Sequence, residues 1–203
     1  MKITHFVRIR PDAVCIDGTR LATEESGIRL LGELYRSSVA DYPKFFKMDP
    51  LSKLGFLAVE LLVKDEPDRF RPREDRAVLL FSRSGSLCDD RSYEKTIAES
   101  DYFPSPALFV YTLANTVTGE IAIRNKYEGD TTAYAMAQFD PGSFIAAVCD
   151  AFEDRITNSA VCGWVECPEA DRFEATVLLV EQDAPDGLPF TEETLENLLQ
   201  SNW

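Results

Sequence analysis

Apolar and polar residues alternate along this chain with two different periods. The helical period, in which apolar residues recur every three or four positions, is clearest over 48–64, where Asp49 can cap the first turn and Pro50 suits the first helical position. The segment 105–123 is apolar almost all round, which predicts a helix buried on most sides. The helical period predicts further helices over 23–38, 91–99, 141–155 and 191–200.

Segments typical of β-strands lie between these helices. The short apolar run at 76–85 is typical of a buried strand, and small and larger residues alternate over 129–138. The strands predicted over 159–167 and 172–182 indicate an antiparallel pair at the end of the sheet, and 3–17 predicts one or two strands. Because helices and strands alternate, we expect an α/β fold with about five strands in a mixed, mostly parallel sheet that helices cover on both faces.

The composition is that of a globular protein with an acidic surface. The chain has 203 residues, of which 45% are hydrophobic and 28% are charged, and we expect a single domain over 1–203. The formal charge of −14 repels nucleic acid and anionic membranes, so partners should be neutral or basic. No apolar run approaches the roughly 20 residues of a membrane-spanning helix, and the N-terminus lacks the features of a signal peptide. We therefore expect a cytoplasmic protein.

Candidate ligands for a metal or a cofactor are scarce. The chain has five cysteines, no C-x-x-C pair and one histidine, His5, so neither a zinc site nor a disulfide framework is predicted. We interpret the cysteines as reduced, mostly buried thiols and His5 as a partly exposed strand residue. The basic cluster at 69–76 includes two acidic residues and is interpreted as a solvated loop. No metal and no cofactor is expected.

The stretch AYAMAQFDPGSF, residues 133–144, predicts the end of a strand, a sharp turn and the start of a helix. Several enzyme classes place a nucleophile at such a corner. Here the corner carries Gln138, whose amide nitrogen is delocalised into its carbonyl and cannot attack a substrate. The segment therefore has the pattern of an enzyme's corner without a nucleophile.

Several segments, in order, resemble the N-terminal half of the β-ketoacyl synthases, the condensing enzymes of fatty acid and polyketide synthesis with the thiolase fold. FFKMDPLSKLGFLAVELLV (45–63) resembles the family's Met-Asp-containing helix, and SPALFVYTLANTVTGEIAIRNKYEGD (105–130) its Pro-led helix and the small-residue segment that follows. TTAYAMAQ (131–138) is similar to the strand that runs into the nucleophile turn, and SAVCGWVEC (159–167) to a Gly-Gly-Glu-like strand end. The resemblance covers residues 45–182 and implies a single thiolase-like half.

In this comparison Gln138 stands at the place of the family's nucleophilic cysteine. The family's thiol forms an acyl thioester, which an amide cannot form. The family's two decarboxylating histidines lie in its C-terminal half, which we expect this chain to lack. Chain-length-factor subunits of type II polyketide synthases also carry glutamine here and pair with an active ketosynthase, and truncated ketosynthase-like proteins occur in aryl polyene pathways. The resemblance thus implies a non-catalytic subunit that forms a heterodimer with a full-length ketosynthase.

The resemblance also implies residues for an interface and an acyl tunnel. In the family, the strand before the nucleophile turn pairs with its twofold mate, which assigns the interface to Thr131, Thr132, Ala133, Tyr134, Ala135, Met136 and Ala137. The acyl-tunnel candidates are Phe109, Met136, Gln138 and Phe139. An ordinary place in the core is the alternative for the apolar ones. Acyl carrier proteins are acidic, so this chain should reach them only through its partner.

The turn departs from the family pattern in one respect. Phe139, Asp140 and Pro141 stand between the nucleophile position and the helix, where the family has small residues. Proline has no N–H to donate and Phe139 is bulky, so an oxyanion-binding backbone is disfavoured.

Two other functions stay open. One is an enzyme, an acyl-thioester decarboxylase or acyltransferase, that uses the thiol of Cys149 or Cys162. Cys149 falls on an apolar helix face and Cys162 has no histidine or lysine neighbour in the sequence, so neither shows the pattern of an activated thiol. The other is a homodimer that binds an acyl group or a small ligand without chemistry.

Overall fold

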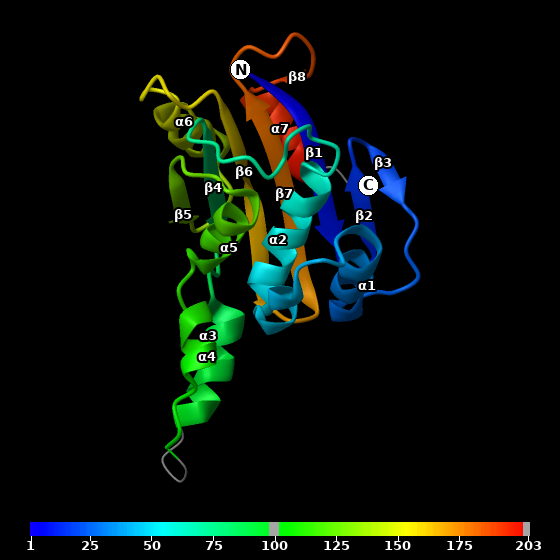
Figure 1. Cartoon of the computed structure of the whole chain (residues 1–203), viewed down its shortest axis with the longest axis vertical. Helices are drawn as coiled ribbons and strands as arrows, with labels where there is room; N and C mark the ends of the chain where they lie inside the picture. Colours follow the sequence, from blue (N-terminus) through cyan, green and yellow to red (C-terminus); the bar gives the residue numbers. More distant parts are fainter. Residues whose placement is uncertain (98–101, 201–203) are drawn as a thin grey trace.

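The described residues form one mixed β-sheet with helices packed against it (Figure 1). The computed structural model describes residues 1–97 and 102–200. The strands lie in the order β3-β2-β1-β7-β6-β4-β5, and β8 pairs with β1 off this path. Their bounds are β1 (Lys2–Arg10), β2 (Ala13–Ile16), β3 (Thr19–Leu21), β4 (Arg76–Ser82), β5 (Thr131–Ala135), β6 (Ser159–Glu169), β7 (Arg172–Glu181) and β8 (Leu188–Pro189).

The parallel part of the sheet is centred on β4. This strand pairs in parallel with β5 and β6, whereas the pairs β6–β7, β7–β1, β1–β2, β1–β8 and β2–β3 are antiparallel. The mixed α/β class and the antiparallel β6–β7 pair are confirmed, but the sheet has eight strands and is mostly antiparallel. Short turns after Arg10 and Ile16 join β1, β2 and β3, and strands joined by such short turns pair antiparallel. β6 and β7 lie inside the sheet, not at its end, because β1 adds to the outer side of β7.

Helices cover both faces of the sheet, as expected. α1, α2 and α5 pack on one face, and α6 and α7 on the other. α3 and α4 form a hairpin that projects from the body at the lower end of the view in Figure 1. The bounds, with the 3-10 helices η1 and η2, are α1 (Ile28–Ser38), η1 (Pro43–Lys47), α2 (Pro50–Leu62), α3 (Leu87–Glu94), η2 (Lys95–Ile97), α4 (Pro106–Tyr111), α5 (Thr116–Asn125), α6 (Pro141–Ala151) and α7 (Glu192–Gln200).

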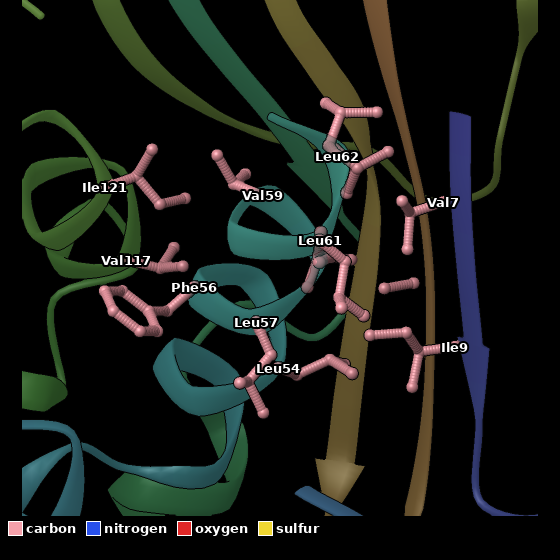
Figure 2. Close-up of a cluster of buried hydrophobic side chains, with 14 of the residues drawn as sticks. Val7, Ile9, Leu54, Phe56, Leu57, Val59, Leu61, Leu62, Val117 and Ile121 are labelled. Carbon is pink, nitrogen blue, oxygen red and sulfur yellow. The ribbon is translucent and has the colours of Figure 1, made fainter. Parts of the chain in front are cut away.

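α2 lies between the sheet and α5 and is buried on nearly every side (Figure 2). Leu61 lies toward Val7 of β1, whereas Phe56 points toward Val117 of α5. The two helices approach closely at Gly55, where a Cβ atom would come within 2.5 Å of the Val117 Cγ2 atom. The apolar side chains of α2 therefore make two packing contacts, one with the strands and one with a neighbouring helix.

A second core lies between the opposite face of the sheet and the helices α6 and α7. The ring of Phe144 on α6 packs against Phe81 of β4, with 4.6 Å between centroids, and near Phe190, with 6.3 Å. Leu195 of α7 is fully buried in the same cluster. α7 therefore covers this face beside α6.

The predicted helix 105–123 is two helices, α4 and α5. The Oγ1 atom of Thr112 donates to the Phe109 carbonyl at 2.7 Å, and that of Thr116 to the Val110 carbonyl at 2.8 Å. Such bonds compete with helical hydrogen bonding and favour the break after Tyr111. α4 is not buried on most sides, since the exposed fractions of Phe109 and Val110 are 52% and 50%.

The basic cluster at 69–76 is an ion-pair network rather than a solvated loop. Arg69 pairs with Glu60, which is buried in α2. Arg73 and Arg76 both pair with Glu66, at 2.9 and 2.7 Å, and Arg76 is fully buried. Because the guanidinium fork can satisfy carboxylates out of water, the network ties the segment after α2 to the body of the protein.

Two other helices begin at residues that differ from the prediction. α1 begins at Ile28 rather than at residue 23, and Asp171 of the β6–β7 turn accepts the Ile28 N–H group at 2.9 Å. A cap from so distant a residue has no local sequence signal. The helix predicted over 91–99 begins earlier as α3 and continues through η2 to Ile97, and residues 98 and 99 lie outside the described residues.

Candidate functional site

The corner predicted over residues 133–144 is present at the carboxyl ends of β4 and β5. β5 ends at Ala135, and the next N–H group, of Met136, still donates to the carbonyl of Ser82 on β4 at 2.9 Å. Gln138 lies in the turn between β5 and α6 with an exposed side chain. Ligands of open α/β sheets bind at the carboxyl ends of parallel strands, so this corner is a candidate site.

Asp140 occupies the N-terminus of α6 with its own carboxylate. Its Oδ2 atom accepts the Ser143 N–H group at 2.8 Å, and hydrogen bonds from the side chain and backbone of Ser143 hold the pKa of Asp140 below its usual range. Pro141 contributes no N–H group at all. A helix N-terminus stabilises an anion through free N–H groups and the positive end of its dipole. Here a carboxylate of the chain already takes that place, so a thiolate or an oxyanion would meet negative charge.

A cavity of about 770 Å³ opens beside Gln138. Its apolar wall includes Phe139, Trp164 and Phe173, and the rings of Phe139 and Trp164 meet edge to face with 5.9 Å between centroids. Arg83 lies just beyond the end of β4, and Arg172 is the first residue of β7.

The sequence alone indicates only part of this lining, as its predicted residues show. It singled out Gln138 and Phe139, but not Arg83, Trp164, Arg172 and Phe173. These four residues come together because β4, β6 and β7 are neighbours in the sheet, which no local pattern indicates. The available signal was that Arg83 directly follows a buried strand and that the β6–β7 connection is short.

The two candidate thiols, Cys149 and Cys162, are not activated. Burial raises the pKa of the Cys149 thiol, and burial alone raises the pKa of the fully buried Cys162. A nucleophilic cysteine needs a lowered pKa. All five cysteines are free, and Cys15, Cys162 and Cys167 are buried, which confirms the prediction of mostly buried thiols.

His5 lies on β1 with an exposed side chain, as predicted, and its Nδ1 atom is 2.8 Å from the Asp17 carboxylate. Within residues 1–97 and 102–200, no three histidine, cysteine or carboxylate side chains are grouped closely enough to hold a metal ion. None of the helices in that part of the chain combines the length and the apolar character needed to cross a membrane.

β5, the predicted interface strand, is an edge strand. It pairs with β4 on one side, and the strand order ends with it. Thr131 and Ala135 are exposed and the three residues between them are half-buried. Because the Met136 N–H group bonds to β4 and alternate residues of a strand face opposite sides, the N–H groups of Ala133 and Ala135 face the free edge. An uncharged open edge of this kind can pair with another strand.

The acyl-tunnel candidates lie in two places. Gln138 and Phe139 line the same cavity, and Met136 packs with Phe139 against the buried cluster between the sheet and α6. Phe109 lies apart on α4, where its ring contacts Tyr93 at 5.6 Å between centroids. Their role in a tunnel stays a prediction.

Comparison with solved structures finds chains of similar fold. No protein-family model matches the sequence. No curated protein matches it either. The structure of the ishigamide ketosynthase/chain length factor superposes with a TM-score of 0.66 over 93% of this chain and 63% of that chain, at 16% identity. A ketosynthase in complex with its chain length factor from Xenorhabdus doucetiae gives a TM-score of 0.57 over 98% of this chain and 90% of that chain, at 15% identity.

A third match, a type II polyketide synthase acyl-carrier protein in complex with its ketosynthase, has a TM-score of 0.57, 11% identity and coverage of 89% of this chain and 62% of that chain. The chain thus spans 63% of the first matched chain and 62% of the third. Likeness at such low identity is informative about the fold alone. The chain has the thiolase-like fold of ketosynthase and chain length factor structures, as the sequence resemblance implied.

Proposed function

We propose that this chain is a non-catalytic, chain-length-factor-like subunit that pairs with an active, full-length β-ketoacyl-ACP synthase in fatty acid or polyketide biosynthesis of the aryl polyene type. One observation carries the proposal. At the corner where the resemblance places the family's nucleophile, Gln138 offers no nucleophilic group and Asp140 closes the N-terminus of α6 with its own negative charge. The shared fold with a solved ketosynthase and its chain length factor supports it.

The free edge of β5 supports pairing with a second protein. Its N–H groups at Ala133 and Ala135 are available to a partner strand, and the strand itself carries no charge that would oppose pairing. We propose that residues 131–137 form the strand-to-strand part of the interface, as the resemblance implies.

A second surface is needed, because an edge segment of seven residues cannot bury the roughly 1,200–2,000 Å² of a stable protein interface. Large apolar side chains are exposed on α4 and on the residues that flank it, among them Phe103, with an exposed fraction of 80%, Phe109 and Leu113. The α3–α4 hairpin projects from the body of the protein (Figure 1), and exposed apolar groups on such an element are typical of a protein-binding surface. We propose that the hairpin contacts the same ketosynthase, with Phe109 toward the acyl tunnel.

The charge of the chain suggests how the acyl carrier protein is reached. A subunit with a formal charge of −14 repels an acidic carrier protein. The ketosynthase should therefore provide the basic docking surface, and this subunit should meet the carrier only indirectly. A cytoplasmic location of the complex is part of the proposal.

Co-expression with a full-length ketosynthase from the same genome tests the proposal. The wild-type chain should co-purify with it, and Ala133→Pro should lose most of the complex, because proline removes an N–H group that faces the free edge. The same substitution removes no hydrogen bond to β4, so the isolated variant should keep its fold by circular dichroism. Ala133→Val keeps the N–H group and is the matched control, which should still co-purify.

Either of two results would contradict the proposal. One is a stable homodimer that never co-purifies with the ketosynthase, which would favour the acyl-binding homodimer. The other is release of CO₂ from a malonyl thioester by the purified chain alone, which would favour the decarboxylase.

A further inference from the structure

We propose that Cys88 on α3 and Cys167 on β6 are a modification site, at which glutathione disulfide converts the two thiols into a reversible disulfide bond. The bond would join the projecting α3–α4 hairpin to a strand inside the sheet. The pairing proposed above assigns no role to any thiol, so this inference goes beyond it.

α3 packs against the part of β6 that carries Cys167. The Arg91 guanidinium group donates to the Pro168 carbonyl at 3.3 Å and lies 3.9 Å from the Glu169 carboxylate. Cys88 stands three residues before Arg91 on the helix, a spacing that puts the two side chains on the same face. Cys88 therefore faces the same segment of β6 as Arg91, and its thiol is within hydrogen-bonding reach of the Cys167 thiol.

The two thiols differ in their access to solvent. Cys88 is half-buried, whereas Cys167 is fully buried and its thiol donates to the Glu169 carbonyl at 3.4 Å. The Cys88 thiolate would therefore attack glutathione disulfide first, which forms a mixed disulfide and releases one glutathione thiolate. The Cys167 thiolate would then attack the Cys88 sulfur and release the second glutathione thiolate. In sum, two protein thiols are oxidised, one glutathione disulfide is reduced, and the two thiol protons pass to the two glutathione thiolates.

The strand is irregular at Cys167. The register between β6 and β7 shifts between Glu166 and Glu169, so Cys167 and Pro168 lie outside the regular ladder of hydrogen bonds. A disulfide bond needs its two Cα atoms at about 4.4–6.8 Å and its Cβ atoms turned toward each other. Because the ladder is already interrupted at this point, the backbone can adjust to that geometry at little cost in strand pairing.

The surroundings of the thiols control how fast the bond forms. Burial, and then the charges of Asp49 and Asp89, raise the pKa of Cys88, whereas a hydrogen bond from the Cys167 thiol and the charge of Arg91 act in the opposite direction. Burial is also the main cause that raises the pKa of Cys167. Because the thiolate is the attacking species, exchange should be slow at neutral pH, and the bond should form under sustained oxidising conditions.

Thiol counting after exposure to glutathione disulfide tests the inference. The folded wild-type protein is incubated at pH 8 with an excess of glutathione disulfide, quenched with acid and alkylated in denaturant. Of its five thiols, two should escape alkylation and return after reduction, and the mass before alkylation should fall by about 2 Da. Trypsin should then release the peptide 84–91, which contains Cys88, linked to the peptide 156–172, which contains Cys162 and Cys167.

Three variants assign the bond to its cysteines. Cys88→Ser changes only a half-buried side chain, so this variant should keep its fold by circular dichroism and lose the linked peptides. Cys167→Ala should lose them as well. Cys162→Ala removes the other cysteine of the same tryptic peptide and is the matched control, which should still form the bond.

Three results would overturn the inference: five free thiols after prolonged exposure, a glutathione adduct on Cys88 that persists without linked peptides, or linked peptides that remain in Cys167→Ala. Any of them would leave the pairing with a ketosynthase unaffected, because co-purification measures that separately.

Discussion

α2 and α6 begin with the same sequence pattern but differ in how deeply they are buried. Each starts with an Asp-Pro pair, Asp49-Pro50 or Asp140-Pro141. The Asp49 carboxylate accepts two N–H groups of the first turn, and the Asp140 carboxylate accepts one. α2 is buried against the sheet on one side and against α5 on another. α6 is buried along one side only, and Ala146 on its outer side is exposed.

Local sequence thus sets where a helix begins but not what covers it. α6 is nearly as apolar as α2, yet Ile145, Ala147 and Cys149 are only half-buried. An apolar helix with one uncovered side, directly after an open edge strand, is what a subunit would present to a partner. The same contrast appears at the caps, because burial raises the pKa of Asp49 while hydrogen bonds lower that of Asp140.

The largest effect should come from shortening apolar side chains on the two helices. Leu57→Ala on α2 should lower the free energy of unfolding by about 3 kcal/mol, because it empties a fully buried site. Ile145→Ala on α6 should cost about 1 kcal/mol, because its side chain is only partly removed from water. Urea unfolding followed by circular dichroism measures both. Equal losses would mean that α6 is covered in the isolated protein as α2 is.

The next largest effect concerns Asp89, a buried carboxyl group of α3. The negative charge of Asp49, which caps α2, acts on this group. Burial, and then the charges of Asp49 and Asp90, raise the pKa of Asp89 to about 6. Because this folded-state pKa lies above the ordinary value, the carboxyl's contribution to stability is complete below about pH 4 and is lost as the pH rises through 6. Asp89→Asn, which mimics the protonated form, should be more stable than wild type at pH 7 by on the order of 2 kcal/mol.

Thermal unfolding at pH 4 and at pH 7 measures this difference. The gain from Asp89→Asn should shrink toward zero at pH 4. A gain that is the same at both values would contradict the assignment.

The pH dependence of stability at the cap of α6 should be smaller than that at Asp89 and opposite in sign. The folded pKa of Asp140 is lowered, so its contribution is present above about pH 4 and is lost as the pH falls through the folded value. Asp140→Ala should therefore lower the Tm by a few degrees at pH 7 and have less effect in acid. Asp49→Ala should follow the reverse trend, because the folded pKa of Asp49 is raised. Calorimetric scans over pH 3–7 separate the two, and parallel trends would refute the contrast between the caps.

The smallest effect should come from the corner itself. Gln138→Ala should leave the complex with the ketosynthase intact and change product length or rate only modestly. Gln138→Cys should not give condensing activity to the chain alone, because Asp140 still closes the helix N-terminus and no histidine is present at the corner among the described residues. Mass spectrometry of the products distinguishes these outcomes. Condensation by the isolated cysteine variant would refute the non-catalytic role.

Features set by neighbouring residues could be predicted from the sequence. Both Asp-Pro helix starts, the buried strand after residue 76 and the β6–β7 hairpin are present as expected, since caps, periods and short turns act over a few residues. The break after Tyr111 has no such signal, because apolar periodicity continues across it while threonine hydroxyls compete for the backbone.

Features set by distant residues could not be predicted. β1 pairs with β7, far along the chain, so the place of the N-terminal strands in the sheet has no local signal. The arginines of the 69–76 segment are paired because Glu60 and Glu66 lie beside them in the fold, although a glutamate in the apolar α2 was a clue. At the site, Gln138 was found from its turn, whereas the cavity beside it required the order of β4, β6 and β7.

We propose that a ketosynthase covers the open edge of β5 and the apolar surfaces beside it. Light scattering of the co-expressed, purified proteins after size exclusion measures the composition of the complex. We expect one copy of this chain with one ketosynthase, and we expect Ala133→Pro to lose this complex. A chain that elutes alone as a stable homodimer, with no ketosynthase bound, would contradict it.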